Sequence, residues 1–173
     1  MIEPWSPQHS QGAIDVVKSV FDEYSFTWEP DGYHADLYDV PTHYLEKGDL
    51  FFVAVQDSQV LGTVAIEFFE NAIPGEESTV QEIEGKLRLA QTDCALLRLY
   101  VRPEARGQGI GRALIETVKT KGAQGGRKSM EIWSDKRFAD AHRLYQKLGA
   151  RIIGDRICND PDTSPEWGLI LDL

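Results

Sequence analysis

One segment in the second half of the chain constrains the fold more than any other. Residues 95–101 are largely apolar, which predicts a strand, and Pro103 ends it. A glycine-rich turn follows. From 109 to 119 apolar residues then recur four positions apart, as in a helix that packs one face on a sheet. A strand that leads through a tight turn into such a helix predicts an α/β fold.

The other periodic segments continue this alternation of strands and helices. Two runs of β-branched and aromatic residues, separated by residues 57–59, predict a β-hairpin. We predict helices over 11–24, 40–46, 109–119 and 138–148, and strands over 51–55, 60–66, 95–101, 129–133, 150–157 and 167–173. Together these elements predict a single domain, residues 1–173, with a mixed sheet.

Composition excludes several classes of protein. The net charge of −10 argues against nucleic-acid binding, because a phosphate backbone requires a basic surface. No apolar run approaches the roughly 20 residues that cross a bilayer, and the first residues lack the features of a secretory signal, so a cytoplasmic protein without membrane contact is expected. Cys94 and Cys158 have no metal-ligand spacing, which predicts two reduced thiols and no metal site.

Charge is unevenly distributed along the chain. Residues 70–93 are acidic, polar and weakly periodic, so an insertion or long loop is predicted there. The segment that follows is basic, as binding of a polyanion would require. It contains Arg98, Arg102, Arg106 and Arg112.

The turn over residues 106–112, RGQGIGR, carries the main chemical prediction. Glycines allow positive φ and a close approach of the backbone to a ligand, and the start of the following helix offers unpaired N–H groups. Two flanking arginines add charge-assisted hydrogen bonds. The turn therefore predicts a phosphate site, although tight packing against a sheet would also explain its glycines.

Two common nucleotide motifs do not fit this chain. In a dinucleotide-binding fingerprint the third glycine would stand at Arg112, but it stands at Gly111. A P-loop is also absent, because the nearest candidate, residues 122–129, has Arg127 where a glycine is required.

Two stretches resemble the GNAT superfamily of N-acetyltransferases. Residues 97–114, LRLYVRPEARGQGIGRAL, are similar to its acetyl-CoA motif, and residues 144–150, LYQKLGA, are similar to a later helix-to-strand motif. The order of elements resembles the family over essentially the whole chain. The resemblance implies a mixed, mostly antiparallel sheet of about six or seven strands with about four flanking helices. Dimerisation is common in this superfamily, so a homodimer is one expectation.

The resemblance also implies a cosubstrate and its site. Acetyl-CoA would lay its pantetheine arm along the backbone of Leu99, Tyr100 and Val101. An amine acceptor would attack the thioester directly, without a metal. The pyrophosphate would lie on residues Arg106, Gly107, Gln108, Gly109, Ile110, Gly111 and Arg112.

Tyr145 matches the tyrosine that protonates the departing thiolate in many family members. A phenol with a pKa near 10 suits a thiolate leaving group. The same residue lies at helical spacing with Phe138 and Leu148, so a plain core role is the competing interpretation.

The general base is left open. The glutamate that some members carry corresponds to Ala95 here, so Glu67, Asp93 or a water molecule are the candidates. His142 is predicted to be an ordinary histidine on a helix surface. Phe138 stands where relatives have an asparagine, and for nearby Arg137 a phosphate contact and an exposed surface position are both considered.

The acceptor is predicted only as a class. In this family the early region lines the acceptor pocket, and aromatic rings and carboxylates there could hold a cation. They could equally cap the sheet. The residues are Tyr24, Phe26, Trp28, Glu29, Asp31 and Tyr33. A small amine, an amino acid or a basic peptide is therefore the expected acceptor, and the alternatives are a non-catalytic acyl-CoA-binding module or a protein-interaction domain that uses residues 70–93.

Overall fold

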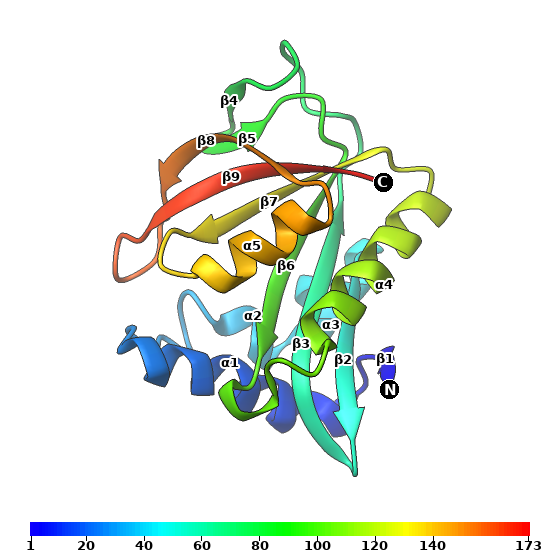
Figure 1. Cartoon of the computed structure of the whole chain (residues 1–173), viewed down its shortest axis with the longest axis vertical. Helices are drawn as coiled ribbons and strands as arrows, with labels where there is room; N and C mark the ends of the chain where they lie inside the picture. Colours follow the sequence, from blue (N-terminus) through cyan, green and yellow to red (C-terminus); the bar gives the residue numbers. More distant parts are fainter. The chain divides into compact units, whose positions relative to one another are not determined.

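The computed structural model describes residues 1–173 (Figure 1). These residues form two compact units. Unit 1 consists of Met1–Glu67 and Leu97–Val118, and unit 2 of Phe68–Leu96 and Lys119–Leu173. The main strands follow the order β1-β2-β3-β6-β7-β9-β8, and β4 and β5 form a separate two-stranded sheet. A mixed, mostly antiparallel sheet is thereby confirmed, with seven strands. The single domain stays a prediction.

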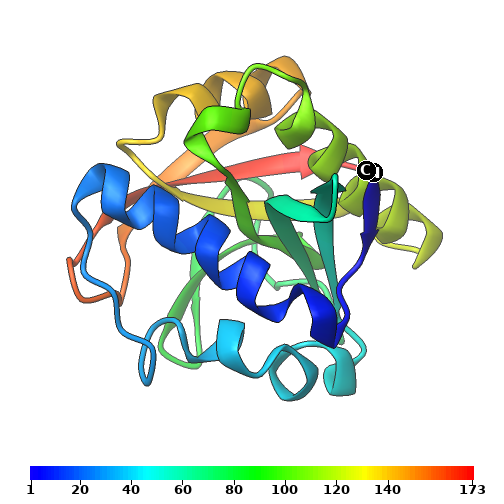
Figure 2. The same cartoon turned by 90° about the horizontal axis from the view of Figure 1, so that it is seen from below.

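Unit 1 holds the N-terminal helices and the predicted hairpin. β1 pairs with β2, and β2 with β3, both antiparallel. α1 and the first part of α4 lie on opposite faces of β2 and β3 (Figure 2). Its elements are β1 (Ile2–Pro4), η1 (Pro7–His9), α1 (Ser10–Tyr24), α2 (Ala35–Tyr38), α3 (Val40–His43), η2 (Leu45–Lys47), β2 (Leu50–Gln56), most of β3 (Gln59–Phe68), the second part of β6 (Cys94–Val101), η3 (Pro103–Ala105) and the first part of α4 (Ile110–Gln124).

The core of unit 1 follows from the pattern of α1. Ala13, Val16 and Val17 are fully buried and pack with Val53 of β2 and Ala65 of β3. Burial of such side chains removes apolar surface from water at about 25 cal/mol per Å², which fixes the helix against the sheet. The helix ends where Ser25 adopts a positive φ of 57°, and the chain then enters the segment that leads to α2 and α3.

Unit 2 is built on three paired strands. β7 pairs antiparallel with β9, and β9 with β8, while the start of β6 runs parallel to β7 from Cys94 to Leu96. Its remaining elements are β4 (Val80–Ile83), β5 (Lys86–Leu89), the end of α4, β7 (Ser129–Asp135), α5 (Ala139–Lys147), β8 (Arg151–Ile157) and β9 (Pro165–Asp172). No helix in the chain has both the length and the apolar character to cross a bilayer.

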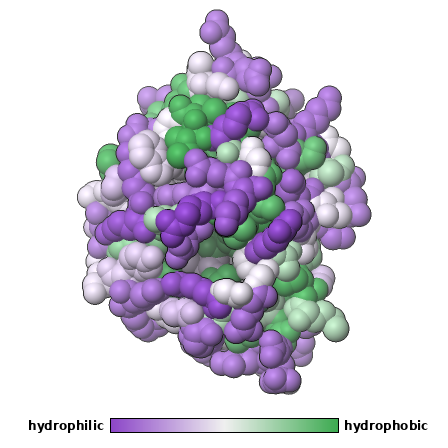
Figure 3. Space-filling model, viewed as in Figure 1, coloured by the Kyte–Doolittle hydropathy of each residue, from purple (hydrophilic) through white to green (hydrophobic).

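Of the two predictions for the acidic segment, an insertion or a long loop, the long loop is wrong. β4 and β5 form an antiparallel hairpin within it, and its outer part is hydrophilic at the top of Figure 3. Glu131 of β7, only 1% exposed, anchors this hairpin by accepting hydrogen bonds from Arg88 Nη1 (2.7 Å) and the Leu89 amide (2.8 Å). A buried carboxylate requires such partners, so the hairpin is tied to the sheet by a contact 43 residues apart in the sequence.

The predicted helix over 40–46 is divided in two. α3 ends at His43 and a 3₁₀ turn follows over Leu45–Lys47. Asp39 caps α3 by accepting a hydrogen bond from the Thr42 amide at 3.2 Å, and Pro41 stands in the first turn as predicted. The other predicted helices and strands are present, with ends that differ by a few residues.

Candidate functional site

The glycine-rich turn of unit 1 presents an open backbone surface. Gly107 and Gly109 have φ of 76° and 82°, and a Cβ at either position would have no neighbour within 4 Å. The first helical hydrogen bond of α4 runs from the Ala113 amide to the Gly109 carbonyl at 3.0 Å. The N–H groups of residues 110–112 therefore precede the helical ladder and lie at the positive end of the helix dipole.

These features fit a bound phosphate group. The turn is exposed from Arg106 to Gly109, and its glycines leave space where side chains would obstruct a ligand. Arg112 lies close by, in the first turn of α4. The guanidinium of Arg106 pairs with the carboxylate of Glu23 in α1, at 2.9 and 2.6 Å.

The strand that leads into the turn is bent at one residue. Arg98 of β6 has a φ of 51°, a conformation that non-glycine residues rarely adopt, and its carbonyl accepts a hydrogen bond from the Thr63 hydroxyl at 2.8 Å. The parallel pairing of β6 with β7 ends at Leu96. Residues 99–101, the predicted site of the pantetheine arm, follow this bend and are half-buried.

The side chain of Arg98 makes a buried ion pair. Its Nε and Nη2 donate to the two carboxylate oxygens of Asp36 in α2, at 2.8 and 2.7 Å, and Nη2 also donates to the Tyr33 carbonyl at 2.7 Å. The Tyr44 hydroxyl donates to the same carboxylate at 2.5 Å. Burial, followed by the charge of Asp36, raises the pKa of Tyr44 well above its usual range.

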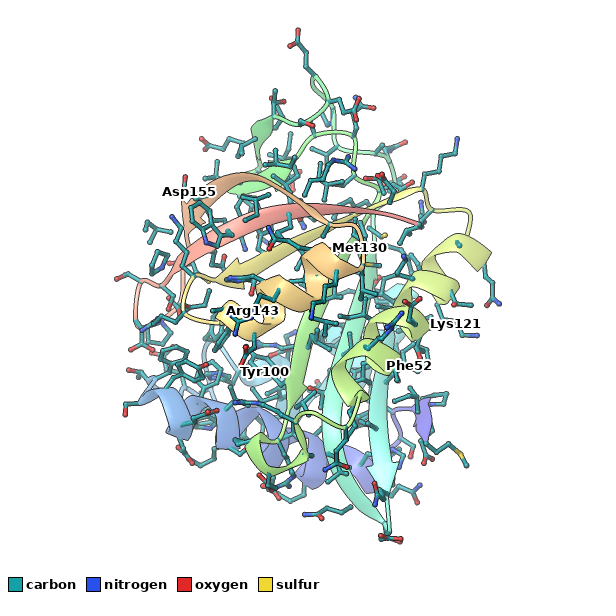
Figure 4. The ribbon with its side chains drawn as sticks, viewed as in Figure 1. Phe52, Tyr100, Lys121, Met130, Arg143 and Asp155 are labelled. Atoms are coloured by element: carbon teal, nitrogen blue, oxygen red, sulfur yellow. The ribbon has the colours of Figure 1, made fainter.

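The aromatic residues that are predicted near the acceptor form one cluster in unit 1. Trp28 stacks on His34 with ring centroids 3.9 Å apart, and Phe21 contacts Trp28 edge-on at 5.6 Å. The ring centroid of Tyr100 of β6, which is labelled in Figure 4, lies 6.0 Å from that of Phe21. Phe26, Trp28 and Tyr33 pack on the core while Glu29 and Asp31 have more exposed positions, so the rings and the carboxylates have different environments.

In unit 2, Tyr145 lies on α5 and is 3% exposed. Its role as an acid stays a prediction. His142, one turn earlier on the same helix, is 8% exposed, and its Nε2 lies 3.1 Å from the Ser134 hydroxyl of β7. The prediction of a surface histidine is therefore wrong, because α5 turns this side chain toward β7. Burial lowers the pKa of His142, against the opposing charge of Asp135.

Two other predicted candidates have structural partners. Arg137 is exposed at 45% and pairs with both carboxylate oxygens of Asp135, at 2.9 and 2.6 Å. The carboxylate of Asp93 accepts hydrogen bonds from the amides of Lys128 and Ser129, which secures the start of β7. The contacts of Asp93 leave the general base open, and the chain contains no group of three or more His, Cys, Asp or Glu that could hold a metal.

Sequence reasoning missed the Arg98–Asp36 pair and the contact between Ser134 and His142. An arginine inside an otherwise apolar strand was a usable signal for Arg98, because a buried guanidinium requires a partner. No comparable pattern marked its partner, 62 residues earlier.

A protein-family model described as "Acetyltransferase (GNAT) family" matches residues 15–150. The chain belongs to the GNAT acetyltransferase family. The human protein "N-acetyltransferase 8B" is 31% identical over 139 residues, and human "N-acetylaspartate synthetase" is 30% identical over 122 residues. These matches cover 80% and 70% of this chain but 52% and 34% of the relatives, so the chain spans about half the length of the first and a third of the second.

Solved GNAT structures share the fold over the whole chain. A GNAT-family acetyltransferase from Staphylococcus aureus Mu50 aligns with a TM-score of 0.76 and 18% identity, covering 100% of this chain and 98% of its own. An aminoglycoside 6′-N-acetyltransferase in complex with coenzyme A aligns with a TM-score of 0.65 and 16% identity, covering 99% and 96%. At these identities the likeness concerns the fold.

Proposed function

We propose that this GNAT chain transfers an acetyl group from acetyl-CoA to a primary amine. The observation that carries the proposal is the open turn between β6 and α4, with two glycines at positive φ, unpaired helix amides and flanking arginines. Such a turn suits a pyrophosphate. Family membership and the coenzyme A bound to a protein of the same fold support the same ligand.

In the proposed reaction the amine nitrogen bonds to the acetyl carbon while the carbon–sulfur bond breaks. A backbone amide of β6 polarises the carbonyl oxygen as negative charge develops there. Tyr145 donates a proton to the departing thiolate and is reprotonated from solvent. Glu67, Asp93 or water accepts the proton that the amine loses. The buried Ala95, which is 2% exposed, offers no carboxylate for that last role.

The acceptor is proposed to be a small amine, an amino acid or a basic peptide. The net charge of −10 and the carboxylates of Glu29 and Asp31 favour a cationic acceptor over an anionic one. The name "N-acetyltransferase 8B" states no acceptor, and "N-acetylaspartate synthetase" names an acetylated acidic amino acid, so the relatives support the reaction class more than a cationic substrate.

The test measures free thiol released from acetyl-CoA against a panel of amines, amino acids and lysine-containing peptides, with Tyr145→Phe in parallel. Release that depends on one acceptor and falls about 10²-fold or more in the variant would support both the activity and the acid. Binding of acetyl-CoA by calorimetry serves as the control for folding. Tight binding without release from any acceptor would favour the alternative, a non-catalytic acyl-CoA-binding module.

A further inference from the structure

We propose that Arg98 and Asp36 are positioning residues, which hold the bend of β6 against the segment that faces the acceptor. This inference rests on the proposed function, because it assigns the pair a role in acetyl transfer. It starts from a main-chain observation. Arg98 has a φ of 51° in the middle of a strand, where a non-glycine residue is strained by about 1 kcal/mol or more. Such a conformation persists only when the surrounding contacts impose it.

The contacts that impose the bend come from both parts of Arg98. Its carbonyl accepts the Thr63 hydroxyl at 2.8 Å, which fixes the main chain from β3. Its guanidinium makes a bidentate pair with Asp36, and the two side chains are only 12% and 13% exposed. The planar fork of an arginine suits this geometry, and a lysine could not reproduce it.

The pair joins two regions with different proposed roles. On one side, residues 99–101 follow the bend directly and are the proposed site of the pantetheine arm and the thioester. On the other side, Asp36 and the Tyr33 carbonyl belong to the segment between α1 and β2, which also carries the aromatic cluster around Trp28. The Arg98 guanidinium also lies over the Tyr33 ring, 4.9 Å from its centroid. Arg98 therefore fixes the position of β6 through its main chain and the position of the acceptor-facing segment through its side chain.

A purely stabilising role predicts different behaviour. Buried ion pairs are weak stabilisers, because the loss of hydration offsets much of the attraction, and apolar replacements of both partners are often neutral. A positioning role requires the pair itself, not only a filled space. The two roles can be separated by comparing variants that keep the fold but lose the bidentate hydrogen bonds between Arg98 and Asp36.

The experiment measures kcat and the KM values for acetyl-CoA and for the acceptor in Asp36→Asn, Arg98→Lys and the double variant Arg98→Met with Asp36→Leu. Each kcat is divided by the concentration of sites that bind acetyl-CoA. We expect kcat to fall at least 10-fold in all three, while KM for acetyl-CoA stays within about twofold, because the phosphate turn is unaltered. The double variant is expected to keep its Tm. Glu166→Gln is the matched control, since it breaks a similar ion pair with Arg156 in unit 2 and should leave kcat unchanged.

Hydrogen exchange supplies a readout that does not depend on activity. In Asp36→Asn, amides 99–101 should exchange at least 10-fold faster, while those of β2 keep their rate. A wild-type protein without transferase activity would contradict the proposed function, and the exchange result would still decide whether the pair holds the bend of β6. Unchanged exchange at 99–101, or a double variant with full kcat, would overturn the inference.

Discussion

At the scale of single residues, the conformations of a few backbone positions determine what the chain can bind. Gly107 and Gly109 have positive φ within the phosphate turn, and Gly48 has a similar φ of 86° at the end of η2. A Cβ at any of these three glycines would have no neighbour within 4 Å. A side chain would therefore strain the backbone to a similar extent at all three positions, but only Gly107 and Gly109 belong to the proposed phosphate site. This difference makes the turn testable.

We predict that Gly109→Ala raises KM for acetyl-CoA about 10-fold, because alanine disfavours the positive φ and places a methyl group where the phosphates approach. The cost in stability should be about 1–2 kcal/mol. Gly48→Ala is the control, with a similar loss of stability and an unchanged KM. Steady-state kinetics and denaturant unfolding measure the two effects. An equal rise of KM in both variants would count against the turn as the phosphate site.

A second prediction concerns the ion pair between Glu23 and Arg106. Both side chains are 38% exposed, so the pair adds little stability, but its carboxylate occupies donors that a phosphate would use. Glu23→Gln should therefore lower KM for acetyl-CoA about two- to fivefold and change the free energy of unfolding by less than about 0.5 kcal/mol. Asp22→Asn, which breaks an exposed pair with Lys18 on the same helix, is the control. A higher KM in Glu23→Gln would mean that Glu23 orients Arg106 instead.

At the scale of elements, α5 is held by a buried titratable group. Burial lowers the pKa of His142 below the ordinary value of about 6.5 that applies in the unfolded chain. As pH falls below about 6.5, His142 binds a proton in the unfolded chain but stays neutral in the folded chain, so the folded state loses stability. The loss continues until the pH reaches the lower pKa of the folded state.

His142→Gln removes this titration and keeps a polar group near Ser134. We predict that the Tm of the wild type, relative to that of the variant, decreases between pH 7.5 and pH 5. A change of 1 kcal/mol shifts the Tm of a domain of this size by about 2–4 °C, so the trend is measurable. His43→Gln, at an exposed position, is the control, because it shows how Tm responds to the loss of an imidazole that is not buried. A Tm difference that stays constant with pH would show that His142 does not titrate in this range.

At the scale of the whole molecule, a protein with a net charge of −10 is proposed to bind a polyanion. The local arginines and helix amides of the turn must therefore outweigh a repulsive average field. Coenzyme A carries the phosphates and pantetheine does not. The two ligands thus separate the contribution of the turn from that of the strand.

We predict that coenzyme A at 100 times its Kd adds about 2.7 kcal/mol to the free energy of unfolding and raises Tm by about 5–10 °C. Pantetheine at the same concentration should raise Tm by less than about 2 °C, because it lacks the groups that the turn binds. Differential scanning fluorimetry measures both shifts. Gly109→Ala is the control and should lose about half of the coenzyme A effect, because a 10-fold weaker Kd leaves about 1.4 kcal/mol at the same concentration. Equal shifts with the two ligands would place the binding energy outside the turn.

Local patterns were sufficient for most of the elements. The apolar spacing in α1 and α4 and the β-branched runs of β2 and β3 depend on neighbours only a few residues away, so they are readable without a structure. The hairpin β4–β5 was missed because its sequence is polar and weakly periodic. Its stability depends on Glu131, which the chain supplies 43 residues after Arg88.

The sequence by itself determined the glycine turn, the strand before it and the helix after it, and with them the family. These features depend on φ preferences and on periodicity, which act between adjacent residues. Only the tertiary structure decided the pairing of Arg98 with Asp36, the pairing of Arg106 with Glu23 and the burial of His142. The physical reason is that each depends on which helix face packs against which strand. That choice is made by the free energy of burying the whole core and not by any local stretch of the chain.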